Sequence, residues 1–216
     1  WNGPAGQLGE LKDFSKIKIK TRALTDMTKG GPAQWNKPVT TRGRLSLVPG
    51  AYVVDTITVP EDNPWKSWIR CSGFDFFEDG TTAAMCSVTG DVWIVSGIDE
   101  ELKELKWRRY ATGLFQPLGL KIVEGQVYVL GRDQITRLHD LNKDGEADFY
   151  ENFNNDISIT NHYHEFCLNL STDPEGNFYF IKGGNLRKAT VPHHGCLVRV
   201  SKDGSKLEIV ATGHRA

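Results

Sequence analysis

Residues 72–113 read SGFDFFEDGTTAAMCSVTGDVWIVSGIDEELKELKWRRYATG, a stretch in which short apolar runs alternate with glycine-containing turns. Short runs rich in β-branched and aromatic side chains, bounded by turn residues, are typical of β-strands. The pattern predicts four strands, at 72–80, 82–88, 92–98 and 107–113. The charged run EELKELK at 100–106 indicates a short helix between the last two.

The same cycle of strands and turns returns twice, over about 117–153 and 165–213. Equivalent positions fall at Gly73, Leu118, Cys167 and Arg215, so the repeat is 45 to 49 residues long. A repeat of about 40–50 residues with four strands is the sequence signature of a β-propeller, in which each four-stranded sheet is one blade. We therefore predict an all-β propeller with about three blades in this chain, and a β-sandwich is the alternative.

The number of blades bears on the organisation of the chain. Propellers have at least about four blades, so three units do not close a ring. We expect residues 51–216 to be the N-terminal part of a propeller that is completed by more of the same or another chain. Residues 1–50, rich in Gly and Pro, are expected to form an arm with a strand at 14–19. A strand predicted at 51–59 would close the ring with the last blade.

The composition argues against several classes of protein. The chain carries 26 basic and 27 acidic side chains, a formal net charge of −1, whereas proteins that bind nucleic acid usually have a basic excess. No apolar run approaches the roughly 18 residues that cross a bilayer, so no transmembrane segment is expected in this stretch. The four cysteines form no CxxC or CxxCH motif, which argues against a zinc knuckle and haem attachment here. We expect buried thiols, with one or two disulfides as the alternative.

Residues 140–151, DLNKDGEADFYE, match the calcium-loop pattern D-x-[DN]-x-[DN]-G-x5-E at every specified position. Ca²⁺ takes about six to eight oxygen ligands, which such spacing can supply around one ion. The predicted ligands are Asp140, Asn142, Asp144, the carbonyl of Glu146, Asp148 and Glu151. Because the flanks read as strands, we expect a structural ion between strands, with Glu151 the weakest assignment. An acidic hairpin loop without an ion is the alternative.

Histidines gather in the last third of the sequence. Five of the six follow residue 160, namely His162, His164, His193, His194 and His214. They lie in predicted loops between strands, which in a propeller can meet at one mouth of the central channel. Three interpretations stay open: a general base, a transition-metal site formed by His162 and His164 with His193 or His194, and ordinary loop histidines bonded to the backbone.

Two other polar segments lie between predicted strands. They are the run GRDQ, which contains Arg132 and Gln134, and the run KGGN at 182–185. Each is either a turn or a contact that faces the channel. An arginine there would suit an anionic cofactor, because its guanidinium pairs bidentately with carboxylates.

The third unit, HEFCLNLSTDPEGNFYFIKGG followed by HHGCLVRVSKDGSKLEIVATGHR, resembles the soluble glucose dehydrogenase and L-sorbosone dehydrogenase type of six-bladed propeller. The phrases DNPW (62–65), RDQITRLHDLNKDGEADFYENFNND (132–156) and VPHHG (191–195) are more similar to large bacterial extracytoplasmic proteins called membrane-bound dehydrogenase domains. In that group a c-type cytochrome domain often follows the propeller. The resemblance covers about three quarters of the chain, from about residue 52 to residue 216.

The resemblance implies binding of calcium and pyrroloquinoline quinone (PQQ), and a periplasmic or other extracytoplasmic location. His164 aligns with the general base that takes the substrate hydroxyl proton, and Arg215, beside His214, aligns with an arginine that contacts the cofactor carboxylates. The predicted cofactor contacts are Arg215, His214, Arg132 and Gln134. The family has Asn where this chain has Ala216, and the calcium loop at 140–151 is not the family's cofactor-bridging site.

Two functions follow as hypotheses. The first is a sugar or alcohol dehydrogenase that passes hydride to a quinone cofactor and electrons to a cytochrome domain or protein, whose haem c would lie outside this chain. The second is a non-catalytic propeller, stabilised by calcium, that binds carbohydrate or a protein partner.

Overall fold

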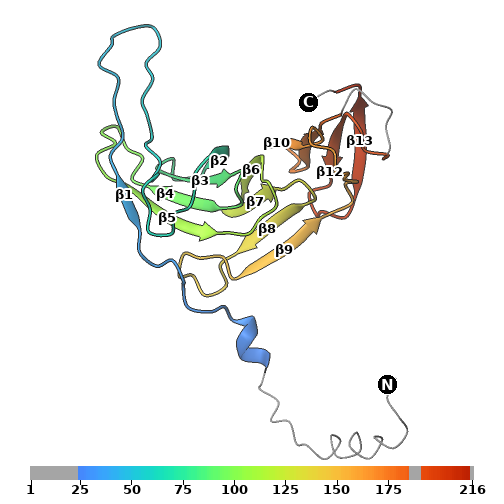
Figure 1. The fold of residues 1–216 in the computed structure, drawn as a ribbon, viewed down its shortest axis with the longest axis horizontal. Coiled ribbons are helices and arrows are strands. Elements are labelled where there is room, and N and C mark those ends of the chain that lie inside the picture. Colours follow the sequence, from blue (N-terminus) through green and yellow to red (C-terminus); the bar gives the residue numbers. More distant parts are fainter. Residues whose placement is uncertain (1–23, 185–190, 215–216) are drawn as a thin grey trace, which may run out of the picture.

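The computed structural model describes residues 24–184 and 191–214 (Figure 1). It contains three antiparallel sheets, each built on a meander of four consecutive strands, with a fifth strand added to the first sheet, and thus forms about three blades of a β-propeller. Blade 1 comprises β2 (Cys71–Phe76), β3 (Thr82–Ser87), β4 (Val92–Ser96) and β5 (Leu105–Ala111). Blade 2 comprises β6 (Gly119–Val123), β7 (Gln126–Leu130), β8 (Ile135–His139) and β9 (Phe149–Asn154). Blade 3 comprises β10 (Cys167–Thr172), β11 (Phe178–Lys182), β12 (Cys196–Val200) and β13 (Leu207–Thr212).

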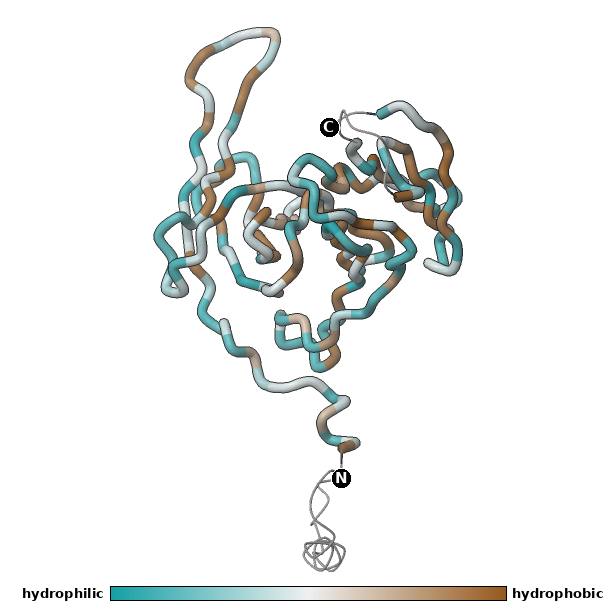
Figure 2. The backbone as a smooth tube through the Cα atoms, turned by 45° about the vertical axis from the view of Figure 1, so that its right-hand side comes forward, coloured by the Kyte–Doolittle hydropathy of each residue, from teal (hydrophilic) through white to brown (hydrophobic). Residues whose placement is uncertain are grey.

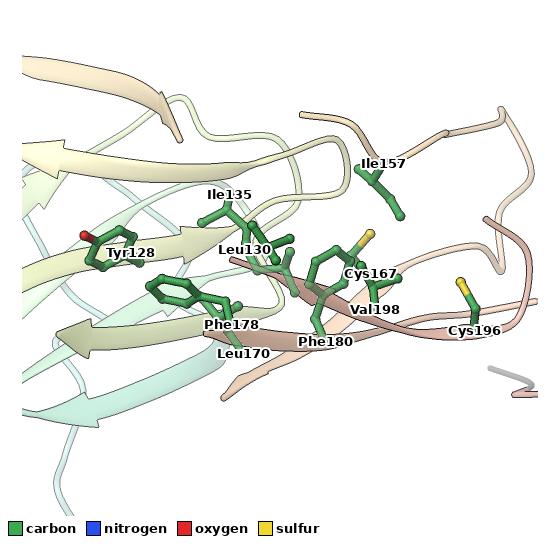
Figure 3. Close-up of a cluster of buried hydrophobic side chains, with 11 residues drawn as sticks. Tyr128, Leu130, Ile135, Ile157, Cys167, Leu170, Phe178, Phe180, Cys196 and Val198 are labelled. Atoms are coloured by element: carbon green, nitrogen blue, oxygen red, sulfur yellow. The ribbon is translucent and has the colours of Figure 1, made fainter. Parts of the chain in front are cut away.

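The blades pack face to face because successive strand residues point to opposite sides of a sheet. In β7, Val127 and Val129 join a core with blade 1, whereas Tyr128 and Leu130 join a core with blade 3. Figure 3 shows the second of these cores, with Tyr128 and Leu130 next to Phe178 from β11. All four residues are buried, and the alternating direction of the side chains along the strand decides which blade each one contacts.

The innermost strands β2, β6 and β10 lie side by side, as they do around a propeller axis. Their close approach depends on two glycines. A Cβ on Gly73 would lie 2.8 Å from the backbone nitrogen of Leu120, and a Cβ on Gly119 would lie 2.8 Å from that of Leu170. The backbone N–H of Asn169 donates to the carbonyl of Leu118 at 3.1 Å, which bonds blade 3 directly to blade 2.

A fifth strand, β1 (Val39–Thr41), pairs with β5 on the outer edge of blade 1. It belongs to the N-terminal arm, which also carries the short 3-10 helix η2 (Leu24–Thr28). The predicted strand at 14–19 lies outside the described residues.

The predicted strand at 51–59 is wrong: within the described residues, a bridge between Arg44 and Thr56 is its only strand pairing. The segment belongs to a long excursion between β1 and β2 that projects from the body and carries apolar stretches (Figures 1 and 2). Its side chains Tyr52 and Val54 are 94% and 77% exposed. Strand propensity reflects packing on a sheet surface, and here the described residues offer no neighbouring strand.

The predicted helix at 100–106 is also wrong. The carboxylate of Asp99 accepts the backbone N–H groups of Glu101 and Leu102 at 3.0 and 2.7 Å and closes a turn there. Leu105 and Trp107 then point to the core as alternate residues of β5. An aspartate that bonds nearby backbone favours a turn over a helix.

All four cysteines are free. Cys86, Cys167 and Cys196 are buried, as predicted, whereas Cys71 is exposed on β2, the edge strand of its sheet. Burial raises the pKa of Cys86 and of Cys167 to about 12, so both are protonated thiols at neutral pH. Among the described residues, no helix is long and apolar enough to cross a membrane.

Candidate functional site

The loop between β9 and β10, which joins blades 2 and 3, carries the first histidine pair. His164 is exposed and His162 is half-buried. The backbone N–H of His164 donates to Nδ1 of His162 at 3.2 Å, and the two ring centroids are 5.8 Å apart. The ring of Tyr163 meets that of His164 edge-on at 5.0 Å. The loop therefore presents the His164 imidazole to solvent while the neighbouring ring supports its backbone.

Arg132 holds this loop from the β7–β8 turn. Its guanidinium donates to the carbonyl of Thr160 at 3.3 Å and to that of His162, and also to Oε1 of Gln116 at 3.1 Å. It lies over the ring of Phe166, with 5.1 Å between the guanidinium carbon and the ring centroid. Only 7% of Arg132 is exposed. The cation therefore fixes the loop backbone from inside.

A buried ion pair holds the other end of the loop. Glu165 is 1% exposed and Lys182, the last residue of β11, is fully buried. Nζ of Lys182 donates to the carbonyl of Glu165 at 2.7 Å and lies 3.7 Å from its carboxylate, which also accepts the hydroxyl of Thr160 at 2.6 Å. Burial lowers the pKa of Lys182.

The second histidine pair precedes β12 and packs behind the loop. Nδ1 of His193 accepts the backbone N–H of Ser158 at 2.8 Å, and burial lowers the pKa of His193. Nδ1 of His194 lies 3.7 Å from the Glu165 carboxylate. The structure thus brings both pairs to one region, where His193 serves as a backbone acceptor.

A metal site formed by His162 and His164 with His193 or His194 was one interpretation of the sequence. One ring nitrogen of His162 and one of His193 already accept a backbone N–H. Within residues 24–184 and 191–214, no three His, Cys, Asp or Glu side chains are arranged to hold a metal ion.

Three of the four predicted cofactor contacts, Arg132, Gln134 and His214, lie within the described residues. Arg132 is buried and bonded to the loop, and the amide of Gln134 donates to the hydroxyl of Thr136 at 2.8 Å. The backbone N–H of His214 donates to the carbonyl of Gly195 at 2.9 Å. Arg215 lies outside the described residues.

The acidic loop at 140–148 connects β8 to β9 and is closed by its own backbone. The Asp140 carboxylate accepts the N–H groups of Asp144 and Gly145 at 3.2 and 2.8 Å. The side chains of Asn142 and Asp144 each accept an N–H two residues further on, at 3.0 and 3.1 Å. Gly145 has a φ of 88°, and a Cβ there would collide with the Arg108 guanidinium, so the turn requires glycine.

The remaining loop acids have other partners. The Glu146 carboxylate accepts the N–H groups of Gln34 and Trp35 at 2.6 and 3.0 Å, and that of Asp148 accepts the N–H of Gly31 at 2.9 Å. Asn142 adds a third contact, because its Nδ2 donates to the carbonyl of Gly31 at 2.5 Å, and Asp148 also accepts the N–H of Leu141 at 2.9 Å. The arm therefore docks on the loop through Asn142, Glu146 and Asp148.

Glu151 does not face the acidic loop as its place in the motif predicted. It lies within β9, and its carboxylate pairs with Arg137 and His139 of β8 at 2.7 and 2.6 Å. In a calcium loop followed by a helix the twelfth residue turns back to the ion, whereas a strand carries it along the sheet.

The reasoning from sequence missed Glu165, and it interpreted Lys182 as part of a turn or of a segment facing the channel, whereas Lys182 is buried at the end of β11. Lys182 lies two residues after Phe180 and four after Phe178, in phase with the buried face of β11. A lysine in that phase is rarely buried without a partner, and this was the available signal.

No family model matches the chain, and no curated protein matches it. Among solved structures it is similar to a putative oxidoreductase (glucose dehydrogenase) of Thermus thermophilus, with 18% identity and a TM-score of 0.48 over 63% of this chain and 44% of that one. It is also similar to a glucose dehydrogenase, with 14% identity and a TM-score of 0.48 over 64% of this chain and 47% of the other. The chain spans less than half of either protein, and the assignment of the fold rests on the three sheets themselves.

Proposed function

We propose that the chain is the propeller part of a sugar or alcohol dehydrogenase in which His164 accepts the proton of the substrate hydroxyl. The observation that carries the proposal is an exposed imidazole on a loop between two blades, with buried ionic side chains fixing the loop backbone on both sides of it. Loops held by a rigid scaffold are a common place for catalytic groups, and histidine is the most frequent general base.

Oxidation of a carbinol removes a proton from oxygen and a hydride from carbon. In the proposal the unprotonated His164 ring takes the proton through a ring nitrogen that faces solvent. His162 positions the base, because its Nδ1 accepts the His164 backbone N–H. Because Arg132 is buried and bonded to the loop, the proposal assigns to the described residues only the proton-accepting half of the reaction.

The proposal extends to the cellular setting that the sequence resemblance implies. A quinone of the PQQ class would be the hydride acceptor, a cytochrome the next electron acceptor, and the compartment extracytoplasmic. These assignments rest on the resemblance in the third unit of the sequence.

The test is turnover of the full chain with added PQQ and Ca²⁺, followed by dye reduction across a panel of sugars and alcohols. We expect His164→Gln to lower the rate at least about 100-fold, the typical contribution of a general base. His139→Gln is the matched control, because His139 lies in β8 and pairs with Glu151. Absence of turnover on every substrate, or an unchanged rate in His164→Gln, would overturn the proposal.

We also propose a structural calcium ion in the loop at 140–148. Asp140, Asn142 and Asp144 fit it, since their side chains turn into one tight loop and retain free lone pairs after bonding the backbone. In a calcium titration with a competing chelator, Asp144→Asn should weaken binding about tenfold or more, and Glu151→Gln should leave it within about twofold. Equal losses in both variants would show that Glu151 is a ligand after all.

The second candidate function is a non-catalytic propeller that binds carbohydrate or a protein. Arg132 and Lys182, the two buried cations near the histidines, donate to backbone carbonyls of the loop. This structural role favours a non-catalytic function. It predicts carbohydrate binding that survives His164→Gln, with no dye reduction by either form. Loss of turnover together with intact binding in that variant would instead favour the enzyme.

A further inference from the structure

A cavity of about 570 Å³ opens between blades 1 and 2, beside the acidic loop and away from the His164 loop. Its wall on blade 1 is formed by alternate residues of β4 and β5, which point toward blade 2. Pro38 of the arm and Gly145 of the acidic loop border it. Small-molecule sites typically occupy about 300–1,000 Å³, so the volume suits a ligand of modest size.

The floor of the cavity is apolar. Phe77, Ile94 and Tyr110 line it, and they are partly buried hydrophobic residues at the margin of the core between blades 1 and 2. Val127 of β7, which belongs to that core, completes the floor from blade 2. A ligand with an apolar body would therefore extend an existing core and remove these rings from water.

One end of the cavity is basic. Lys106 and Arg108 lie two residues apart on the same face of β5, and Lys143 approaches from the acidic loop. Arg108 donates to the backbone carbonyl of Asp144. Within residues 24–184 and 191–214, no carboxylate forms an ion pair with Arg108 or Lys143, and Lys106 pairs only with the exposed Glu104, at 3.4 Å.

Among the described residues, only Asp140 contributes a carboxylate to the wall of this cavity. Its two oxygens accept backbone N–H groups of the acidic loop, from Asp144 and Gly145. The basic end thus keeps an excess of positive charge, and cations over an apolar floor favour a ligand that is both apolar and anionic.

We propose that this cavity binds an organic anion, with an apolar ring against Phe77, Ile94 and Val127 and a carboxylate toward Lys106, Arg108 and Lys143. The inference goes beyond the proposed dehydrogenase function, because none of these residues belongs to the His164 loop.

The experiment separates the ring from the charge. The full chain, labelled with ¹⁵N, is titrated with 2-naphthoate, with its uncharged analogue 2-naphthylmethanol, and with acetate, and amide shifts are followed by NMR. We expect 2-naphthoate to shift amides of β4, β5 and the acidic loop, and to bind at least about tenfold more tightly than either comparison compound.

Removal of the positive charge uses two exposed lysines, so that the fold is spared. The double variant Lys106→Gln/Lys143→Gln should weaken 2-naphthoate about tenfold, whereas Lys103→Gln/Lys202→Gln, which removes two exposed lysines outside the cavity, should not. Equal binding of naphthoate and naphthylmethanol, equal losses in both double variants, or shifts confined to other parts of the chain would overturn the proposal.

Discussion

The acidic loop between β8 and β9 and the His164 loop between β9 and β10 carry the candidate functional side chains, and they differ in what closes their backbone. The acidic loop at 140–148 is closed by bonds between its own carboxylates and its own N–H groups, and the arm and Arg108 add contacts from outside it. The His164 loop at 158–166 is held by side chains distant in sequence, chiefly Arg132 and Lys182. A loop closed from within has a local sequence signature, whereas a loop held from outside depends on the packing of two blades.

The largest loss of stability is expected when Lys182, one of the two side chains that hold the His164 loop, is replaced. Lys182→Met removes the donor to the Glu165 carbonyl and a cation close to its buried carboxylate. We expect a loss of about 3 kcal/mol in the free energy of unfolding, measured in urea, because breaking a buried ion pair from one side is costly. A loss below about 1 kcal/mol would contradict a structural role for the pair.

The same variant has a pH signature. The folded pKa of Lys182 is lowered from its ordinary value of 10.5, so the unfolded chain holds the proton more tightly. Stability from this group therefore rises as the pH rises toward 10.5, relative to Lys182→Met, in which the rise is absent. The comparison also cancels the titration of the buried Cys86, on whose pKa Lys182 has no effect. Parallel pH curves for the two proteins would show that Lys182 is not desolvated.

A smaller loss of stability is expected when Arg132, the other side chain that holds the His164 loop, is replaced. Arg132→Lys keeps the charge but loses the fork that reaches the carbonyls of Thr160 and His162 together. We expect about 2 kcal/mol of destabilisation, by urea unfolding, since two partly buried carbonyls lose charge-assisted donors. Full stability in Arg132→Lys would mean that charge alone holds the loop.

A still smaller loss of stability is expected when the acidic loop loses the hydrogen bonds that close it. Without calcium, Asp140→Ala deletes the acceptor of two partly exposed backbone N–H groups, which should cost about 1 kcal/mol by thermal or urea unfolding. Asp140→Asn, which keeps one good acceptor oxygen, is the graded control and should cost about half as much. A cost above that of Lys182→Met would reverse the ranking of the two loops.

The smallest effect on stability belongs to the exposed base. His164→Gln should change the free energy of unfolding by less than about 0.5 kcal/mol, because the ring is exposed and its backbone bond to His162 remains. Unfolding curves of this variant and of the wild type should therefore overlay. A large loss would make any effect on turnover a folding effect.

The same contrast decides what could be predicted from sequence. The strand positions follow from alternation and turns, because neighbouring strands of each blade are also neighbours in sequence. The turn at Gly145 follows from a motif whose bonds span only a few residues. The strand around Val54 was predicted wrongly, because strand propensity does not show whether a partner strand exists.

The His164 loop was only partly predictable. The sequence pointed to the histidines as a cluster, and the structure places both pairs in one region. The role of Arg132 was not predictable, because the sequence does not show whether an arginine is buried or faces a ligand. Its partners lie at positions 116, 160 and 162, and only the packing of blades 2 and 3 brings them together.

Amide hydrogen exchange tests the central contrast most directly. Arg132→Lys should speed exchange across 158–166 and leave 140–148 unchanged, whereas Asp140→Ala should do the reverse, since each variant removes the support of one loop only. If either variant loosens both loops to the same extent, the two loops are not held independently and the account is contradicted.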